Sequence, residues 1–370
     1  MTAAHRFRAF AAALAVVAAT VAASPVDTGG QTSFPRCRFV EGRFVQPEPL
    51  TIDFWDSVKR AFTSRRGPWP DFTPMPPGPP PPRRVEGGDL RVTFVNHSTF
   101  LIQVDGLNVL TDPTWAGRSV EVVGVHRRRP PGLRLEDLPP IDAVLISHDH
   151  QDHMDLPTLR RLVAAWHPAI YCGLGNAAFL ARHGVPGGID LDWWQQADLA
   201  AGVTLTAVPA RHHAGRGLFD GDRRLWCGFV LSGPSGEIYF AGDTGWGSHF
   251  ASIAGRFPRI RLALLPIGGF KPVWYMHEHH LGPADAIRAQ RVLGASTSVP
   301  MHFGTFPNGD EADGEAVETL RALLAADPGA VCGFEVLENG QALDVAPFHP
   351  ARAAPGAAEN LRWPNPSARR

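Results

Sequence analysis

Short apolar segments bounded by glycine, asparagine or proline recur along the chain from residue 89 onward. The first three are rich in β-branched residues and predict β-strands: LRVTFVNHSTFLIQVDG, LNVLTDP and IDAVLISH. Apolar residues at helical spacing follow in LPTLRRLVAAW, where Pro157 is acceptable in the first turn, and in GNAAFLARHG.

A second series repeats this alternation. It predicts strands in GVTLTAVPARHH, RLWCGFVLSG, GEIYFAGDTG, RLALLPIG and TSVPMHF, and a helix in GPADAIRAQRVLG. Two successive halves of this kind, each with a mixed sheet, predict an α/β fold. We expect a four-layer αββα sandwich over residues 86–346, followed by a loose tail at 347–370.

The chain before residue 86 has a different pattern. Residues 51–65 predict a helix packed on the main domain, because Phe54, Val58, Ala61 and Phe62 recur at helical spacing. Nine prolines between Pro68 and Pro82 then predict a stiff, extended strap, so that residues 24–85 form a helix and strap on the main domain. The aromatic residues of this region line a groove for acyl chains or simply pack on the core: Phe54, Trp55, Phe62, Trp69 and Phe72.

The first 23 residues resemble a secretory signal peptide. Arg6 and Arg8 precede an Ala/Val/Leu-rich segment that is short and weakly apolar for a membrane span. Cleavage before Ser24 would release a protein exported to the periplasm or cell envelope. The alternative is an uncleaved membrane anchor.

Composition and charge limit the classes of function that the protein can have. A chain of 370 residues is long enough for two domains or one large α/β unit. Its 35 basic and 36 acidic residues nearly cancel and create no electrostatic field that would attract nucleic acid, so we predict no nucleic-acid partner. The remaining candidates for the substrate are a small molecule or a phospholipid. Peripheral contact with a membrane is a further option. Four cysteines without CxxC spacing predict buried thiols and no disulfide. The sequence does not indicate whether the protein is a monomer or an oligomer.

A dense group of metal-binding residue types follows an apolar segment in AVLISHDHQDHMDLP. His148 and His150 are two apart at a strand end, where both side chains point to the same side. Asp152 and His153 follow at the start of the next helix and can face a second ion. Imidazole and carboxylate without thiolate suit Zn²⁺, with Mn or Fe as alternatives.

The pattern HxHxDH after an apolar strand resembles the signature of the metallo-β-lactamase superfamily, whose fold is an αββα sandwich. The segments NHSTFLIQ, LTDPTW, LWCGF, FAGDTGW, LLPIGGFKPVWYM and MHFGTF further resemble the branch of N-acyl-phosphatidylethanolamine-hydrolysing phospholipase D and its bacterial relatives. This resemblance implies one zinc on His148, His150 and His212. It implies a second zinc on Asp152, His153 and His302, with Asp243 bridging the two ions beside a shared hydroxide.

Several roles around the predicted ligands depend on the same resemblance. His212 is preferred over His213 as the ligand, because alternation puts the two on opposite faces and the family spacing from Pro209 favours the former. His280, in WYMHEHH, is implied to orient the substrate or donate a proton, and a helix cap or surface role is the alternative.

His97 and Asp112 are our candidates for hydrogen-bonding the ligands from outside, and buried turn residues are the alternative reading. The adjacent Trp193 and Trp194 could form a lipid-facing patch, but core packing is favoured.

The predicted function is a dinuclear zinc hydrolase. Asp152, Asp243 and His280 are its candidate catalytic residues, and two ions about 3.5–4 Å apart can activate a shared water for attack on phosphorus. The resemblance implies a phosphodiesterase of phospholipase D type. A lactonase or esterase of the same fold and a non-catalytic metal-binding scaffold are the alternatives. Lactam cleavage is disfavoured, because Asp243 stands where lactam-cleaving members typically have cysteine.

Overall fold

The computed structural model describes residues 37–348 except 121–123, 218 and 328–332. The predicted leader at 1–23, most of the predicted tail and Cys332 lie outside the described residues. Export of the chain therefore stays a prediction. Within the described residues, no helix is both long and apolar enough to cross a membrane.

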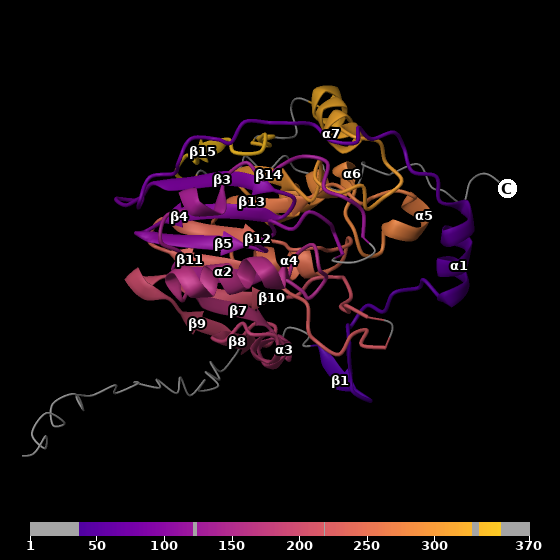
Figure 1. Ribbon diagram of the computed structural model, residues 1–370, viewed down its shortest axis with the longest axis horizontal. Helices are drawn as coiled ribbons and strands as arrows, with labels where there is room; N and C mark the ends of the chain where they lie inside the picture. The colour runs from indigo at the N-terminus through magenta and orange to yellow at the C-terminus, as the bar shows by residue number, and fades with distance from the viewer. Residues whose placement is uncertain (1–36, 121–123, 218, 328–332, 349–370) are drawn as a thin grey trace, which may run out of the picture. The chain divides into compact units, whose positions relative to one another are not determined.

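A seven-stranded mixed sheet forms one half of the fold (Figure 1). Its strand order is β15-β3-β4-β5-β6-β7-β8; β15 and β3 to β5 pair antiparallel, and β5 to β8 pair parallel. The strands span Leu90–Asn96 (β3), Thr99–Val104 (β4), Leu107–Thr111 (β5), Ala143–Ile146 (β6), Ala169–Gly173 (β7), Gly188–Leu191 (β8) and Ala342–Asp344 (β15).

A six-stranded sheet forms the other half, in the order β14-β13-β12-β11-β10-β9. Because β11 is antiparallel to both neighbours, β10, β12, β13 and β14 all run in one direction. The strands span Gln196–Asp198 (β9), Thr204–Val208 (β10), Gly228–Gly233 (β11), Gly236–Phe240 (β12), Ile260–Pro266 (β13) and Thr297–Met301 (β14).

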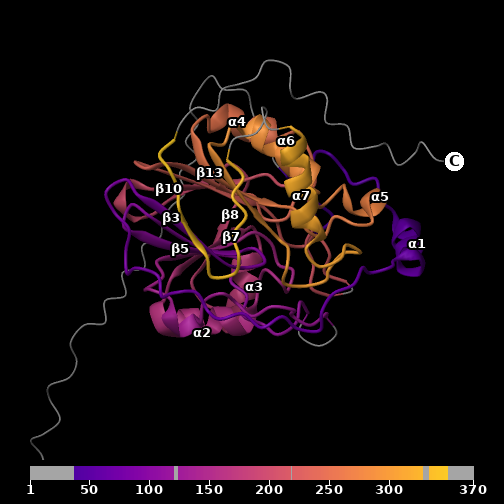
Figure 2. The ribbon, with the colours of Figure 1, turned by 90° about the horizontal axis from the view of Figure 1, so that it is seen from above.

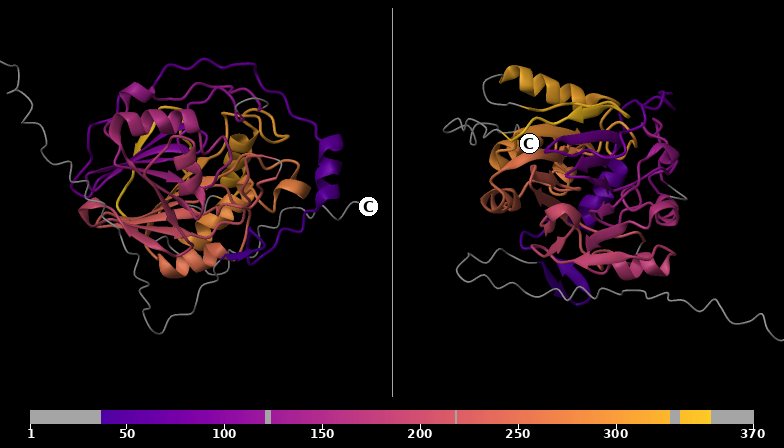
Figure 3. Two further views of the ribbon diagram at one scale, coloured as in Figure 1. Left: turned by 60° about the horizontal axis from the view of Figure 1, so that its bottom comes forward. Right: turned by 90° about the vertical axis from the view of Figure 1, so that its left-hand side faces the viewer.

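Helices cover the outer face of each sheet (Figures 2 and 3). Helices α2 (Leu156–Trp166) and α3 (Asn176–Arg182) lie on the seven-stranded sheet, while α4 (His249–Arg256) and α6 (Pro283–Leu293) lie on the six-stranded sheet, with α7 (Glu315–Ala326) against α6. This arrangement confirms the predicted αββα sandwich. The remaining elements are a hairpin of β1 (Arg38–Val40) and β2 (Arg43–Val45), α1 (Phe54–Thr63), α5 (Val273–Met276) and the 3₁₀ turns Leu135–Asp137 and Ala200–Gly202.

Burial on both faces explains why the sequences of several strands are continuously apolar. Strands β4, β5, β6 and β13 are buried along their whole length, because a helix layer covers one face and the other sheet covers the opposite face. Leu159 and Leu162 of α2 pack with Val144 and Ile146 of β6 in one core cluster. Pro157 lies in the first turn of α2, as the sequence predicts, and the Asp155 side chain caps the helix by accepting from the Thr158 amide.

The N-terminal helix contacts the rest of the protein through its polar side. The helix spans Phe54–Thr63 and begins with a capping box between Asp53 and Asp56, but its apolar side does not face the core. Trp55 is 71% exposed and Phe62 is 87% exposed. Polar side chains of α1 make its contacts with α5, so the core-packing alternative is wrong for Trp55 and Phe62.

Two further predictions concern side chains outside the metal-ligand motif. Trp193 and Trp194 are both buried, and the Trp193 indole donates to the Trp226 carbonyl at 2.8 Å, which confirms core packing. Among the described cysteines, Cys37, Cys172 and Cys227 are free.

Candidate metal site

The candidate site lies at one edge of the two sheets, where strands running in the same direction end. His148 to His153 follow β6, His212 follows β10, Asp243 follows β12 and His302 follows β14. Each of these loops starts from a buried strand, which fixes the position of its first residues. The sandwich thus brings residues from four separate parts of the chain to one place.

His148, His150 and His212 form one group of potential ligands, with one nitrogen of each within 4.8 Å of the others. His148 Nε2 lies 2.8 Å from His150 Nδ1, and His212 Nε2 lies 3.4 Å from that same atom. The other nitrogen of His212 contacts the His279 carbonyl at 2.8 Å, and a donated hydrogen bond there leaves Nε2 available for a cation.

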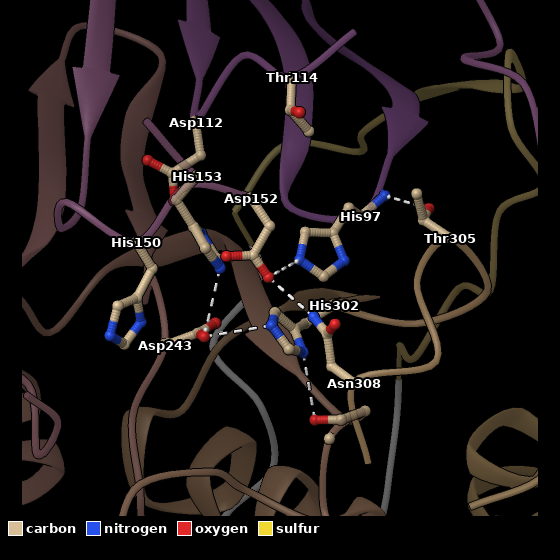
Figure 4. Close-up of polar contacts among 12 residues, drawn as sticks. His97, Asp112, Thr114, His150, Asp152, His153, Asp243, His302, Thr305 and Asn308 are labelled. Carbon is tan, nitrogen blue, oxygen red and sulfur yellow. Dashed lines mark hydrogen bonds and ion pairs between the residues drawn. The ribbon is translucent and has the colours of Figure 1, made fainter. Parts of the chain in front are cut away.

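Asp152, His153 and His302 form a second group, joined by His97. Asp152 Oδ2 lies 3.3 Å from His97 Nε2, and the His97 ring lies 4.1 Å from the His302 ring (Figure 4). The His97 carbonyl also accepts from the His302 amide at 2.8 Å. His97 therefore contacts two members of this ligand group, Asp152 and His302.

Asp243 lies between the two groups (Figure 4). Its Oδ2 atom is 3.2 Å from His153 Nε2 and 3.1 Å from His302 Nε2. The same oxygen is 4.0 Å from His148 Nε2 and 3.9 Å from His212 Nε2. One carboxylate oxygen thus approaches imidazoles of both groups, as a residue shared by two cations must.

Asp112 supports this arrangement from outside. Its carboxylate accepts from the Ser147 amide at 2.7 Å and from the Ser147 hydroxyl at 2.6 Å, and it contacts His153 Nδ1 at 2.7 Å. Ser147 also contacts His148 Nδ1 at 2.9 Å. Asp112 thus contacts one predicted ligand, His153, while Ser147, which directly precedes His148 in the sequence, contacts another.

Sequence reasoning missed Asn308. Its side-chain amide donates to Asp152 Oδ2 at 2.7 Å, so Asp152 is held by contacts from both His97 and Asn308. Asn308 lies in a loop after β14 and carries no local pattern that would indicate this contact.

The charges of the site are strongly coupled. Burial, reinforced by neighbouring imidazoles, lowers the pKa of His148 and of His212 well below the usual value, so both are neutral as metal ligands must be. Burial alone would lower the pKa of His153, but the nearby Asp243 and Asp112 carboxylates outweigh it and raise that pKa well above normal. Burial would raise the pKa of Asp243, yet His153 and His302 hold it well below normal.

Three further histidines surround the first group. His280 Nδ1 lies 3.8 Å from Asp243 Oδ2. The His213 ring lies 4.9 Å from the His150 ring and 5.2 Å from the His279 ring, beside the ligands rather than within a ligand group. Strand β10 ends at Val208, so strand alternation does not extend to His212 and His213. The carbonyl contact of His212 separates their roles instead.

The residues present fit bound divalent cations. Within the described part of the chain, the buried Asp243 Oδ1, His97 Nδ1 and His280 Nδ1 atoms lack hydrogen-bond partners, which is costly for polar atoms removed from water. The donor set of imidazoles and carboxylates suits Zn²⁺ and related transition metals. The two ligand groups meet at Asp243.

Comparison with known proteins agrees with this reading. Residues 107–303 match the model of the beta-lactamase superfamily domain. An uncharacterized protein of Mycobacterium tuberculosis is 38% identical over 315 residues, which cover 83% of this chain and 81% of that protein. An N-acyl-phosphatidylethanolamine-hydrolyzing phospholipase D of Caenorhabditis elegans is 34% identical over 60% of this chain and 65% of that enzyme.

A solved structure of a metallo hydrolase has a similar fold. Igni18, a metallo hydrolase from the archaeon Ignicoccus hospitalis, aligns with a TM-score of 0.52 and 25% identity over 70% of this chain and 99% of its own. The fold and the histidine-aspartate site therefore define a metal-dependent hydrolase. The chain belongs to the metallo-β-lactamase superfamily.

Proposed function

We propose that the protein is a dinuclear zinc phosphodiesterase of phospholipase D type that acts on N-acyl-phosphatidylethanolamine-like lipids. The observation that carries the proposal is the place of Asp243 Oδ2, within 4.0 Å of imidazole nitrogens from both ligand groups. The similarity to the worm phospholipase D supports the choice of substrate class.

The candidate ligands have distinct roles in the proposed reaction. His148, His150 and His212 would hold one cation, Asp152, His153 and His302 the other, and Asp243 would contact both. Two cations bound there would supply an activated water and neutralise charge on the phosphoryl oxygens. Water adds to phosphorus, the bond from phosphorus to the head-group oxygen breaks, and the head-group alcohol leaves with a proton, so that phosphatidic acid remains.

His280 would orient the substrate. Its Nδ1 atom lies 3.8 Å from Asp243 Oδ2 and has no hydrogen-bond partner among the residues that the structure describes, although the side chain is mostly buried. A phosphoryl oxygen beside Asp243 would satisfy it. Asn308 and His97 would hold Asp152 in place, since both contact its Oδ2 atom.

The test compares the rates of hydrolysis of several substrates by protein with the same zinc content. N-acyl-phosphatidylethanolamine and bis(p-nitrophenyl) phosphate should be cleaved, with release of phosphatidic acid from the lipid, and acyl-homoserine and sugar lactones should be poor substrates. Asp243→Ala and His302→Ala should abolish cleavage. His183→Ala is a matched control, because His183 is an exposed histidine at the end of α3.

The outcomes separate the alternatives. Rapid lactone opening with inert diesters would replace the phosphodiesterase with a lactonase. A zinc-loaded protein that turns over no ester, lactone or diester would be a metal-binding scaffold. Metal-free protein with full activity would contradict the dinuclear mechanism altogether.

A further inference from the structure

Helix α1 turns its apolar side toward solvent. Trp55 and Phe62 are seven residues apart, two helical turns, and therefore lie on one face of the helix. Trp55 is 71% exposed and Phe62 is 87% exposed. An amphipathic helix on a globular protein normally buries this face, so the orientation requires an explanation.

The polar side of α1 holds it on the protein. The Ser57 hydroxyl lies 3.0 Å from the Tyr275 hydroxyl, and the Lys59 ammonium lies 4.5 Å from the Trp274 ring centroid. Just before the helix, the amide of Thr51 donates to the Glu278 carboxylate at 2.5 Å. These contacts fix the helix on α5 and the segment after it, so the exposed apolar face is a built feature rather than a frayed end.

We propose that this face of α1, which we call the α1 face and define by Trp55 and Phe62, docks on an anionic phospholipid bilayer. Tryptophan and phenylalanine are the side chains that anchor helices lying in the membrane interface. Lys59 and Arg60 contact α5, whereas Arg65 and Arg66, directly after the helix, are exposed and give this end of α1 a positive charge balance. A negatively charged lipid surface complements this balance.

The size of the α1 face disfavours a second copy of the chain as the occupant. One tryptophan and one phenylalanine bury about 150–250 Å² each, whereas a stable protein interface needs about 800 Å² per partner. A helix of ten residues is about 15 Å long and can lie flat at a bilayer surface. A bilayer needs no matching surface of fixed shape, so a small aromatic face suffices.

Docking through α1 would bring the metal site to the membrane. Helix α5 lies beside α1 (Figure 2), and the chain continues from α5 to His280. The Tyr275 ring lies 5.5 Å from the His279 ring, and His280 Nδ1 lies 3.8 Å from Asp243. The consequence that a lipid substrate reaches the site from the bilayer rests on the proposed function, whereas docking itself does not.

The experiment measures sedimentation of the zinc-loaded full chain with vesicles, independently of turnover. Vesicles of phosphatidylcholine mixed with phosphatidylglycerol should bind the protein, and pure phosphatidylcholine should bind it more weakly. The double variant Trp55→Ser, Phe62→Ser should bind about 30-fold more weakly or worse, because two apolar side chains no longer enter the interface. Ile189→Thr is the control, since Ile189 is 40% exposed on β8 in the other part of the fold.

Hydrolysis of bis(p-nitrophenyl) phosphate and the thermal melting curve verify that each variant is folded. The proposal would be overturned if the unmodified protein did not bind anionic vesicles. It would also be overturned if the folded double variant bound these vesicles as tightly as the control variant. A double variant that changes from dimer to monomer in light scattering would assign the α1 face to a second copy and reject the bilayer. If vesicles bind but no diester is cleaved, docking stands and the proposed function fails.

Discussion

Replacing Asp112 by asparagine tests whether this buried carboxylate controls metal affinity. Asp112 is not a metal ligand in the proposed arrangement, but its Oδ2 atom contacts His153 Nδ1 at 2.7 Å. It also accepts the amide and the hydroxyl of Ser147. Asparagine keeps the size of the side chain, so the change removes charge and one acceptor with little loss of packing.

The expected magnitude follows from these three contacts. An asparagine oxygen can still accept the Ser147 amide, which leaves its NH₂ group facing His153 Nδ1. The His153 ring must then accept at Nδ1 and carry its proton on Nε2, the atom that faces Asp243. Losing one hydrogen bond to a charged group costs about 1.5–3 kcal/mol, or about 10- to 100-fold in affinity, in line with other supports of metal ligands.

The assay is a competitive zinc titration against a chelating dye at fixed pH. We expect the Asp112→Asn protein to bind at least one equivalent of zinc about tenfold more weakly or worse, and excess zinc to restore part of the diester hydrolysis. Asp190→Asn is the matched control, because Asp190 accepts the amides of Gly175 and Ala177 and contacts no candidate ligand. The control should lose stability but not zinc affinity.

A zinc affinity of Asp112→Asn within about threefold of the unmodified protein would refute this reasoning, since the coupling to His153 predicts more. An equal loss in Asp190→Asn would refute it as well, because the effect would then reflect general destabilisation.

Three further predictions concern other parts of the structure. His212→Ala should remove about one zinc per chain in elemental analysis, whereas His213→Ala should retain both, and the reverse result would exchange their roles. Zinc affinity should fall as the pH falls, because the raised pKa of His153 means that a proton competes with the metal; proton release on zinc addition measures this, and its absence would contradict the assignment. Trp193→Ala should lower the free energy of unfolding by about 3–5 kcal/mol in a urea titration, since the indole is buried and hydrogen bonded; a change near zero would contradict its core position.

The sequence by itself determined the local features. Asp155 and Pro157 mark the start of α2, and the spacing of His148 and His150 after an apolar strand identified a metal-binding loop. The strand and helix periods were sufficient for the αββα sandwich. These features depend on residues within a few positions of one another, so their physical causes are visible in a short stretch of chain.

The tertiary structure alone decided which distant residues meet. Asp243 approaches His153 and His302 because β6, β12 and β14 end at one edge, and Asn308 reaches Asp152 across 156 positions. The buried side of α1 could not be predicted either, because an amphipathic period shows that a helix has two faces but not what each face contacts. Such contacts arise from the packing of whole sheets and helices, which no local pattern of residues encodes.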